Sequence, residues 1–155
     1  MENIVTDWNL RFLKLAEHVS TWSKDSTKVG AVIVDPTTKQ VVGMGYNGFP
    51  RGVEDTVERY ADRETKLKLV CHAELNAILN SNRSVRGCEI YVYPTMMEPN
   101  SCPECSKAIV QSGITKVYGY TGEHLNDRWQ DLAKYSKAIL SEANVEYVSI
   151  EKLTS

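Results

Sequence analysis

The sequence has no long apolar run, no cationic leader and no low-complexity tract. Nowhere do about 18 apolar residues follow one another, which is the length expected of a membrane-spanning helix. Residues 1–7 have neither a positively charged start nor an apolar stretch, so we expect no secretory signal peptide. These absences lead us to expect a soluble, cytoplasmic protein with no membrane partner.

An excess of positive charge is also missing. The chain has 18 Lys and Arg residues against 20 Asp and Glu residues, which gives a formal net charge of -2 and a sequence pI near 5.9. Domains that follow a nucleic-acid backbone usually carry a basic patch or stripe. We therefore expect no nucleic-acid polymer as a partner.

No linker or repeat divides the 155 residues, so we expect a single domain over residues 1–155. A chain of this length buries roughly 68 to 70% of its unfolded surface and needs no covalent staples. In a reducing compartment its four cysteines are expected to be metal ligands or buried thiols rather than disulfides.

Apolar periodicity predicts alternating helices and strands. Strands are expected at residues 29–34, 41–46, 89–93, 116–120 and 145–150. Helices are expected from Trp8 to Trp22, with Thr6 or Asp7 as N-cap, and at residues 54–68, 72–82, 102–113 and 129–144. Strand–helix–strand passages imply right-handed parallel crossovers. The pattern therefore predicts an α/β fold with three α/β/α layers around a five-stranded mixed sheet.

The segment at residues 54–68 is densely charged. Three of its acids stand four residues before a base, in the pairs Asp55 and Arg59, Asp62 and Lys66, and Glu64 and Lys68. This spacing supports an isolated helix through side-chain pairs on one face. We expect a solvated helix that covers the outside of the fold.

Two short motifs contain the side chains suited to a zinc ion. His72, Cys102 and Cys105 supply one imidazole and two thiols, whereas a structural zinc usually takes four protein ligands. A catalytic zinc keeps three protein ligands and leaves one position open. Cys102 and Cys105 are three residues apart, so both sulfurs can face one metal. Glu74 remains as an uncoordinated carboxylate.

Both motifs fit the start of a helix. His72 and Glu74 would point to different sides of a regular helix, but not if His72 precedes the first turn. Pro103 stands at the preferred first position of the second helix. A helix N-terminus lowers the pKa of a thiol and so favours the thiolate that binds metal.

These residues resemble the His-x-Glu and Pro-Cys-x-x-Cys signature of zinc-dependent nucleobase deaminases, most closely the deoxycytidylate (dCMP) deaminase family. The similarity extends to SKDSTKVGA at residues 23–31, GYNGFPRG at 45–52 and VCHAELNAI at 70–78. It covers about the first three quarters of the chain. The resemblance implies a cytidine deaminase-like fold and one Zn²⁺ per chain.

The resemblance also implies the reaction. Zinc held by His72, Cys102 and Cys105 would activate a water molecule that attacks C4 of cytosine, converting dCMP to dUMP with release of ammonia and supplying dUMP for thymidylate synthesis. Glu74 would move the proton of that water to ring nitrogen N3 and later protonate the departing amine.

Further residues follow from the same resemblance. Asn47 would bind the deoxyribose, the backbone at Ala73 would read the base, and Lys24 or Arg51 would hold the phosphate. Tyr120 is a further candidate for the substrate pocket, although ordinary core packing also explains it.

The family is commonly hexameric and regulated by dCTP and dTTP. These effectors, with Mg²⁺, would act through the loop formed by Gly45, Tyr46, Asn47 and Gly48. We therefore expect a homohexamer with this regulation.

One departure from the signature concerns substrate choice. Ser101 stands where the signature has proline, and residues 94–101 make the approach to Cys102 unusually long. Another cytosine or substituted cytosine nucleotide, or a purine base, is therefore an alternative substrate. Met96 and Met97 are expected to fill gaps rather than to line the pocket.

Two other functions fit parts of the pattern. Cys102 and Cys105 have the spacing of a thiol oxidoreductase motif, which would leave His72 and Glu74 unexplained. A non-catalytic zinc module would need Cys71 or Cys88 as its fourth ligand.

Overall fold

The computed structural model describes residues 6–122 and 127–152. The elements follow the order α1 (Asp7–Ser20), β1 (Gly30–Val34), β2 (Val41–Tyr46), α2 (Val57–Ala61), α3 (Arg63–Leu69), α4 (Ala73–Leu79), β3 (Glu89–Tyr93), α5 (Pro103–Ser112), β4 (Lys116–Tyr120), α6 (Asp127–Glu142) and β5 (Glu146–Ile150). Thr6 caps α1, its hydroxyl accepting from the Asn9 amide, as the sequence predicted.

The strands form one mixed sheet in the order β2-β1-β3-β4-β5. β1 pairs antiparallel with both β2 and β3, while β3, β4 and β5 run parallel. The chain therefore passes from β3 through α5 to β4 as a parallel crossover. The passage from β2 through α4 to β3 also joins parallel strands, but β1 lies between them. The five-stranded mixed sheet predicted from the sequence is confirmed.

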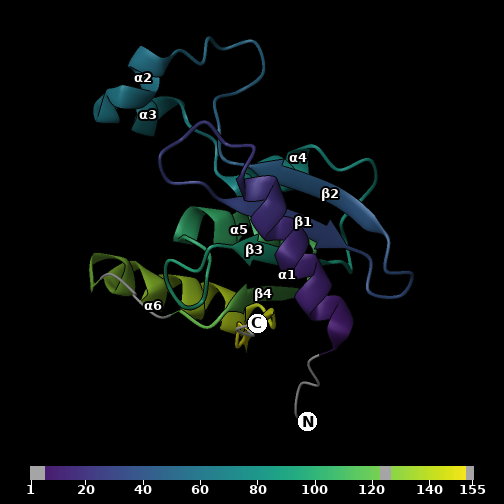
Figure 1. The fold of residues 1–155 in the computed structure, drawn as a ribbon. Coiled ribbons are helices and arrows are strands. Elements are labelled where there is room, and N and C mark those ends of the chain that lie inside the picture. The colour runs from purple at the N-terminus through teal and green to yellow at the C-terminus, as the bar shows by residue number, and fades with distance from the viewer. Residues whose placement is uncertain (1–5, 123–126, 153–155) are drawn as a thin grey trace.

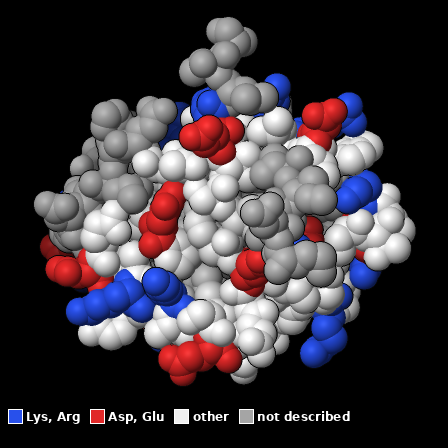
Figure 2. All heavy atoms as spheres, turned by 90° about the horizontal axis from the view of Figure 1, so that it is seen from below, with Lys and Arg blue, Asp and Glu red and all other residues white. Residues whose placement is uncertain are grey.

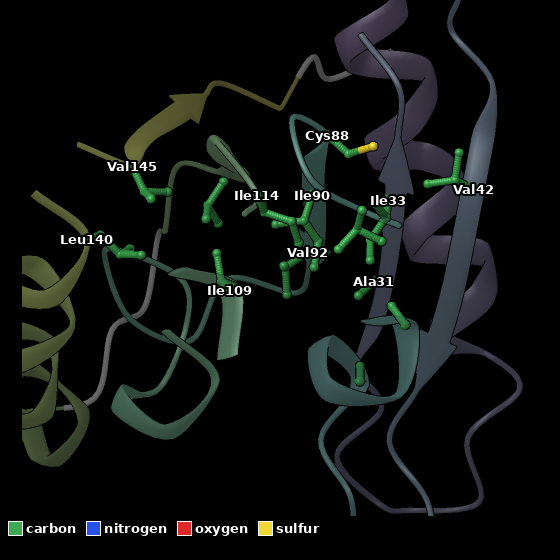
Figure 3. Close-up of a cluster of buried hydrophobic side chains, with 14 residues drawn as sticks. Ala31, Ile33, Val42, Cys88, Ile90, Val92, Ile109, Ile114, Leu140 and Val145 are labelled. Atoms are coloured by element: carbon green, nitrogen blue, oxygen red, sulfur yellow. The ribbon is translucent and has the colours of Figure 1, made fainter. Parts of the chain in front are cut away.

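Helices cover both faces of this sheet and give three layers (Figure 1). On one face α1 packs its apolar stripe, including Phe12, Leu13 and Ala16, against Val32 and Tyr91. On the other face lie α4, α5 and α6. Figure 3 shows side chains from the sheet and these helices gathered in one cluster, among them Ile90, Val92, Ile109 and Ile114. Burial of this cluster holds α4 and α5 in the same layer.

A glycine allows α4 to lie directly against β2. A Cβ atom on Gly45 would stand 2.3 Å from the backbone nitrogen of Ala77 and 2.6 Å from the carbonyl oxygen of Ala73. Only a residue without a side chain permits this approach. Gly45 therefore sets the position of the helix that begins after His72.

The charged segment at residues 54–68 differs from the single solvated helix predicted. It forms two short helices, because Asp62 ends α2 with extended backbone and caps α3 by accepting from the Thr65 amide at 3.5 Å. Figure 1 shows α2 and α3 side by side at one end of the molecule. Glu64 and Lys68 pair at 3.2 Å as expected, but Lys66 reaches inward to Asp25 at 3.0 Å.

Within the described ranges no helix is long and apolar enough to cross a membrane. On the face shown in Figure 2, the described Lys and Arg side chains are interspersed with Asp and Glu, and no continuous basic stretch forms.

Candidate active site

Three potential metal ligands from two different helices meet at one point. The ligand atoms of His72, Cys102 and Cys105 all lie within 4.8 Å of one another. The Nδ1 atom of His72 is 3.3 Å from the sulfur of Cys102 and 3.3 Å from that of Cys105. Nδ1 is therefore the imidazole nitrogen that faces the two sulfurs.

The ligands meet because both motifs form helix starts, as predicted. His72 is the N-cap of α4, and Cys102 is the N-cap of α5, each with extended backbone. Pro103 occupies the first turn of α5, and the Cys105 amide donates to the Cys102 sulfur at 3.4 Å. Since α4 and α5 pack together in one layer, their N-termini bring the ligand groups together.

The two thiols differ in acidity. Hydrogen bonds from Cys105 and then from His72 outweigh burial and lower the pKa of Cys102 to about 4. The hydrogen bond to Cys102, together with burial, raises the pKa of Cys105. The hydrogen bond to Cys102 likewise raises the pKa of His72. Cys102 is thus the more acidic of the two thiols.

The donor set fits zinc. One imidazole and two thiols are borderline and soft ligands of the kind that bind Zn²⁺, and a bound cation favours the thiolate forms of both cysteines. The chain therefore has a zinc site formed by His72, Cys102 and Cys105. Among the described residues neither Cys71 nor Cys88 joins this group, which removes the four-ligand structural module.

Glu74 lies beside the ligands without being one of them. Its side chain is on the first turn of α4 and the residue is only 6% exposed. Burial, followed by the charge of Cys102, raises the pKa of Glu74 to about 7. The sequence-based expectation of a carboxyl group next to a three-ligand metal site thus agrees with the geometry.

Two of the three metal ligands, His72 and Cys102, line a cavity of about 330 Å³. Residues from five parts of the chain line it: Asp25, Thr27, Val29, Asn47, Arg63, Lys66, Leu67, Val70, His72, Ala73, Glu74, Val92, Pro94, Met96, Met97, Asn100, Ser101, Cys102 and Trp129. Of the sequence-based set, the cavity therefore brings His72 and Cys102 together with Glu74, Ala73 and Asn47.

Asn47 is held in place by its neighbours. Its Oδ1 accepts from the backbone of Val29 at 2.9 Å, and its Nδ2 donates to the carbonyl of Thr27 at 2.7 Å. Nδ2 also lies 3.4 Å from the carboxylate of Asp25. The two amide hydrogens are thus engaged, whereas Oδ1 keeps one lone pair for a ligand in the cavity.

The next residue of this loop is tied to the metal site through the backbone. Gly48 and Cys71 exchange two backbone hydrogen bonds of 3.1 and 2.8 Å. The loop at residues 45–48 therefore lies directly beside the residue that precedes His72.

Three predicted substrate residues do not line the cavity. Lys24 is exposed and pairs with Asp55 at 2.7 Å. Arg51 is exposed and donates to the side chain of Asn80. Tyr120 is 5% exposed and belongs to the core beneath α1, as ordinary packing predicts.

The cavity also contains side chains that the sequence did not single out. Arg63 and Lys66 come from the segment expected to be an outer face, Asp25 comes from the loop between α1 and β1, and Trp129 comes from α6. The sequence held one indication that Arg63 and Lys66 could reach the site. The charged segment that contains them ends shortly before His72, so part of it lies close to this metal ligand.

The long loop before Cys102 forms part of the cavity wall. Asn100 fixes this loop, because its side chain accepts from the Met96 amide at 3.1 Å and donates to the Pro94 carbonyl at 2.9 Å. Met97 is 4% exposed and lines the cavity together with Met96. The expectation that both methionines only fill gaps is wrong, since the longer loop folds back over the site.

Comparison with known proteins identifies a family model and several relatives that match this chain. The model of the cytidine and deoxycytidylate deaminase zinc-binding region matches residues 6–121. A protein from Aliivibrio fischeri named as an uncharacterized deaminase in the luxG 3′ region is 40% identical over 147 residues, which cover 92% of this chain and 93% of the relative. The deoxycytidylate deaminase of Mus musculus is 39% identical over 143 residues, covering 86% of this chain and 73% of the relative.

A solved structure shares the whole fold. The dCMP deaminase from the cyanophage S-TIM5, crystallised with dCMP and dUMP, superposes with a TM-score of 0.71 at 26% sequence identity. The match covers 96% of this chain and 100% of that one.

Proposed function

We propose, from the premise that this chain belongs to the cytidine and deoxycytidylate deaminase zinc-binding family, that it hydrolyses dCMP to dUMP and ammonia. The membership makes it a zinc-dependent deaminase. The choice of dCMP is supported by the mouse relative, which is named a deoxycytidylate deaminase, and by the cyanophage enzyme, which was crystallised with dCMP and dUMP. The product would serve as a precursor for thymidylate synthesis.

The observation that carries the proposal is the three-ligand cluster with the buried carboxyl group of Glu74 beside it. His72, Cys102 and Cys105 would hold the zinc. When bound, zinc supplies Lewis-acid activation of water at neutral pH.

Glu74 would move the protons of the reaction. Its carboxylate would accept a proton from water and deliver it to N3 of cytosine. The same group would then take the remaining proton from the new hydroxyl on C4 and pass it to the amine, so that a C4 carbonyl forms and ammonia leaves. Burial of Glu74 excludes bulk water, which would otherwise compete for these protons.

Asn47 and Ala73 would orient the nucleotide. Because both amide hydrogens of Asn47 are engaged, the group that it offers is the remaining lone pair of Oδ1. The 3′-hydroxyl of deoxyribose would therefore donate to Asn47. Ala73, fully buried in the cavity wall, would present its backbone to the base.

A substituted cytosine nucleotide is the second candidate substrate. Met96 and Met97 line the cavity from the long loop, and flexible methionine side chains adapt to groups of different shape. This alternative keeps the same metal site and the same role for Glu74.

Assembly and regulation stay predictions, as does a cytoplasmic location. The exposed ring of Tyr46 and the backbone bridge between Gly48 and Cys71 support the idea that an effector bound at residues 45–48 would reach the metal site. A hexamer, activation by dCTP and inhibition by dTTP are to be tested by sedimentation and by adding each nucleotide with Mg²⁺.

The test of the reaction is a Glu74→Gln variant. The purified protein is expected to contain one zinc per chain by elemental analysis and to convert dCMP to dUMP in an ultraviolet assay, in preference to adenine and guanine compounds. Glu74→Gln is expected to keep the zinc and to lose at least roughly a hundredfold in kcat, because the proton carrier is gone.

Glu104→Gln is the matched control, since Glu104 lies between the two zinc cysteines but is exposed and pairs with Lys107 at 2.7 Å. Its activity should equal that of the parent protein. A zinc-loaded parent that leaves dCMP unchanged, or a fully active Glu74→Gln variant, would refute the proposal.

A further inference from the structure

The two residues expected to bind phosphate lie outside the cavity, which leaves the phosphate of the proposed substrate without a partner. Lys24 is neutralised by Asp55, and Arg51 is turned toward Asn80. Neither lines the cavity next to His72 and Cys102. The candidates for binding this phosphate are therefore the cationic groups among the described residues that line the cavity.

Among the described residues two cations line the cavity, Arg63 and Lys66, and both come from α3. Arg63 makes no hydrogen bond or ion pair with any of the described residues. Its guanidinium therefore has all of its donors available. Arg63 is an exposed residue that also lines the cavity, and a guanidinium can bind a phosphate group through two parallel hydrogen bonds.

Lys66 differs from Arg63 in being fixed. Its ammonium donates to the carboxylate of Asp25 at 3.0 Å, and the two side chains are only 13% and 4% exposed. An ammonium has three hydrogens, so two remain after this bond. Asp25 also lies next to Asn47 and accepts from the Thr27 amide at 3.1 Å. Asp25 thus joins α3 to the loop that holds the predicted sugar ligand.

We infer that Arg63 and Lys66 form the subsite for the 5′-phosphate of the nucleotide, with Asp25 as the residue that positions Lys66. This inference rests on the proposed function, since it takes the substrate to be a nucleoside monophosphate. Arg63 supplies the uncompensated positive charge, and Lys66 supplies further hydrogen bonds from a fixed place. One or two cations suffice for a single phosphate, which agrees with a protein that has no basic excess.

The test compares dCMP with deoxycytidine, which lacks only the phosphate. Arg63→Gln is expected to lower kcat/KM for dCMP roughly ten- to hundredfold, because this is the effect of losing one hydrogen bond to a charged group. Most of the change should appear as a higher KM for dCMP. Deamination of deoxycytidine should be unchanged. Inorganic phosphate should inhibit deoxycytidine deamination by the parent protein and inhibit the variant more weakly. Arg63→Lys should retain part of the preference for dCMP.

Lys68→Gln is the matched control, because Lys68 lies on the same helix, is exposed and does not line the cavity. It should leave both substrates unaffected. If the parent prefers dCMP but Arg63→Gln behaves like Lys68→Gln, the subsite is wrong and the proposed function stands. A selective loss of dCMP activity in Lys24→Gln or Arg51→Gln would likewise place the phosphate elsewhere.

Equal rates of the parent protein on dCMP and deoxycytidine would instead refute the nucleotide preference itself, and the subsite with it. The two failures are therefore distinguished by the parent protein alone, before any variant is compared.

Discussion

Asp25 shows how one buried acid organises a large part of the cavity. Its carboxylate bonds Lys66, the Thr27 amide and the side chain of Asn47, so three different segments meet on it. A buried charge is stable only when its partners remain in place. The ion pair of Lys24 and Asp55 also joins the loop before β1 to the segment before α2, but it lies at the surface, where solvent screens the charges.

At this scale we predict that Asp25→Ala lowers the free energy of unfolding by about 3 kcal/mol, because it leaves Lys66 unpaired in a largely buried place. Chemical denaturation with urea measures the loss. Asp55→Ala removes the exposed pair and should change the midpoint little. Equal effects of the two substitutions would show that burial does not distinguish these ion pairs.

At the scale of elements, the site depends on where two helices begin. The N-termini of α4 and α5 present His72 and Cys102 to one point, and α4 is seated on β2 through Gly45. Because backbone atoms surround Gly45, the neighbouring helix has no flexible side chain to move aside. The distance between β2 and α4 is thereby fixed.

We therefore predict that Gly45→Ala destabilises the protein by about 3 kcal/mol or more and weakens zinc binding, since the added methyl group would displace α4 together with His72. Thermal unfolding and zinc content measure the two effects. Gly48→Ala is the comparison, because the atom nearest to its added methyl group would be the hydroxyl oxygen of Tyr60, 3.6 Å away. If Gly45→Ala is as stable as Gly48→Ala and contains as much zinc, the close contact between α4 and β2 at Gly45 does not determine the zinc site.

At the scale of the whole molecule, the core beneath α1 links stability to alkaline pH. The hydroxyl of Tyr91 accepts from Asn9 of α1 at 2.7 Å, and its ring stacks on Tyr118 with centroids 4.3 Å apart. Burial raises the pKa of Tyr91 to about 12, above the ordinary value of about 10. The folded protein therefore holds this proton more tightly than the unfolded chain does.

The raised pKa of Tyr91 contributes to the free energy of unfolding, and this contribution is fully present below pH 10. It is lost as the pH rises through 12, because the unfolded chain releases the tyrosine proton at a lower pH than the folded protein does. We predict that the free energy of unfolding falls by about 2 to 3 kcal/mol over this range on account of Tyr91. Denaturant titrations at several pH values measure it. Tyr91→Phe should flatten the decline, whereas the exposed Tyr135→Phe should not. An unchanged slope in Tyr91→Phe would contradict the assignment.

The sequence by itself determined the strands, most of the helices and the metal ligands. Apolar periodicity is a local property, and the spacing of Cys102 and Cys105 within one turn is local too, so neither needs tertiary contacts to be recognised. His72 and Glu74 were placed correctly at a helix start because the apolar pattern begins directly after them. The same local patterns predicted the five-stranded mixed sheet that the structure confirms.

Only the tertiary structure decided which charged and flexible side chains enter the cavity. Lys66 had the spacing of an outer-face pair with Asp62, yet it turns inward because Asp25, 41 residues away in sequence, offers a buried carboxylate. Lys24 and Arg51 turn outward for the converse reason, since their partners Asp55 and Asn80 lie at the surface. The direction of a long side chain depends on the partners that folding brings near it, and these partners are distant in the chain.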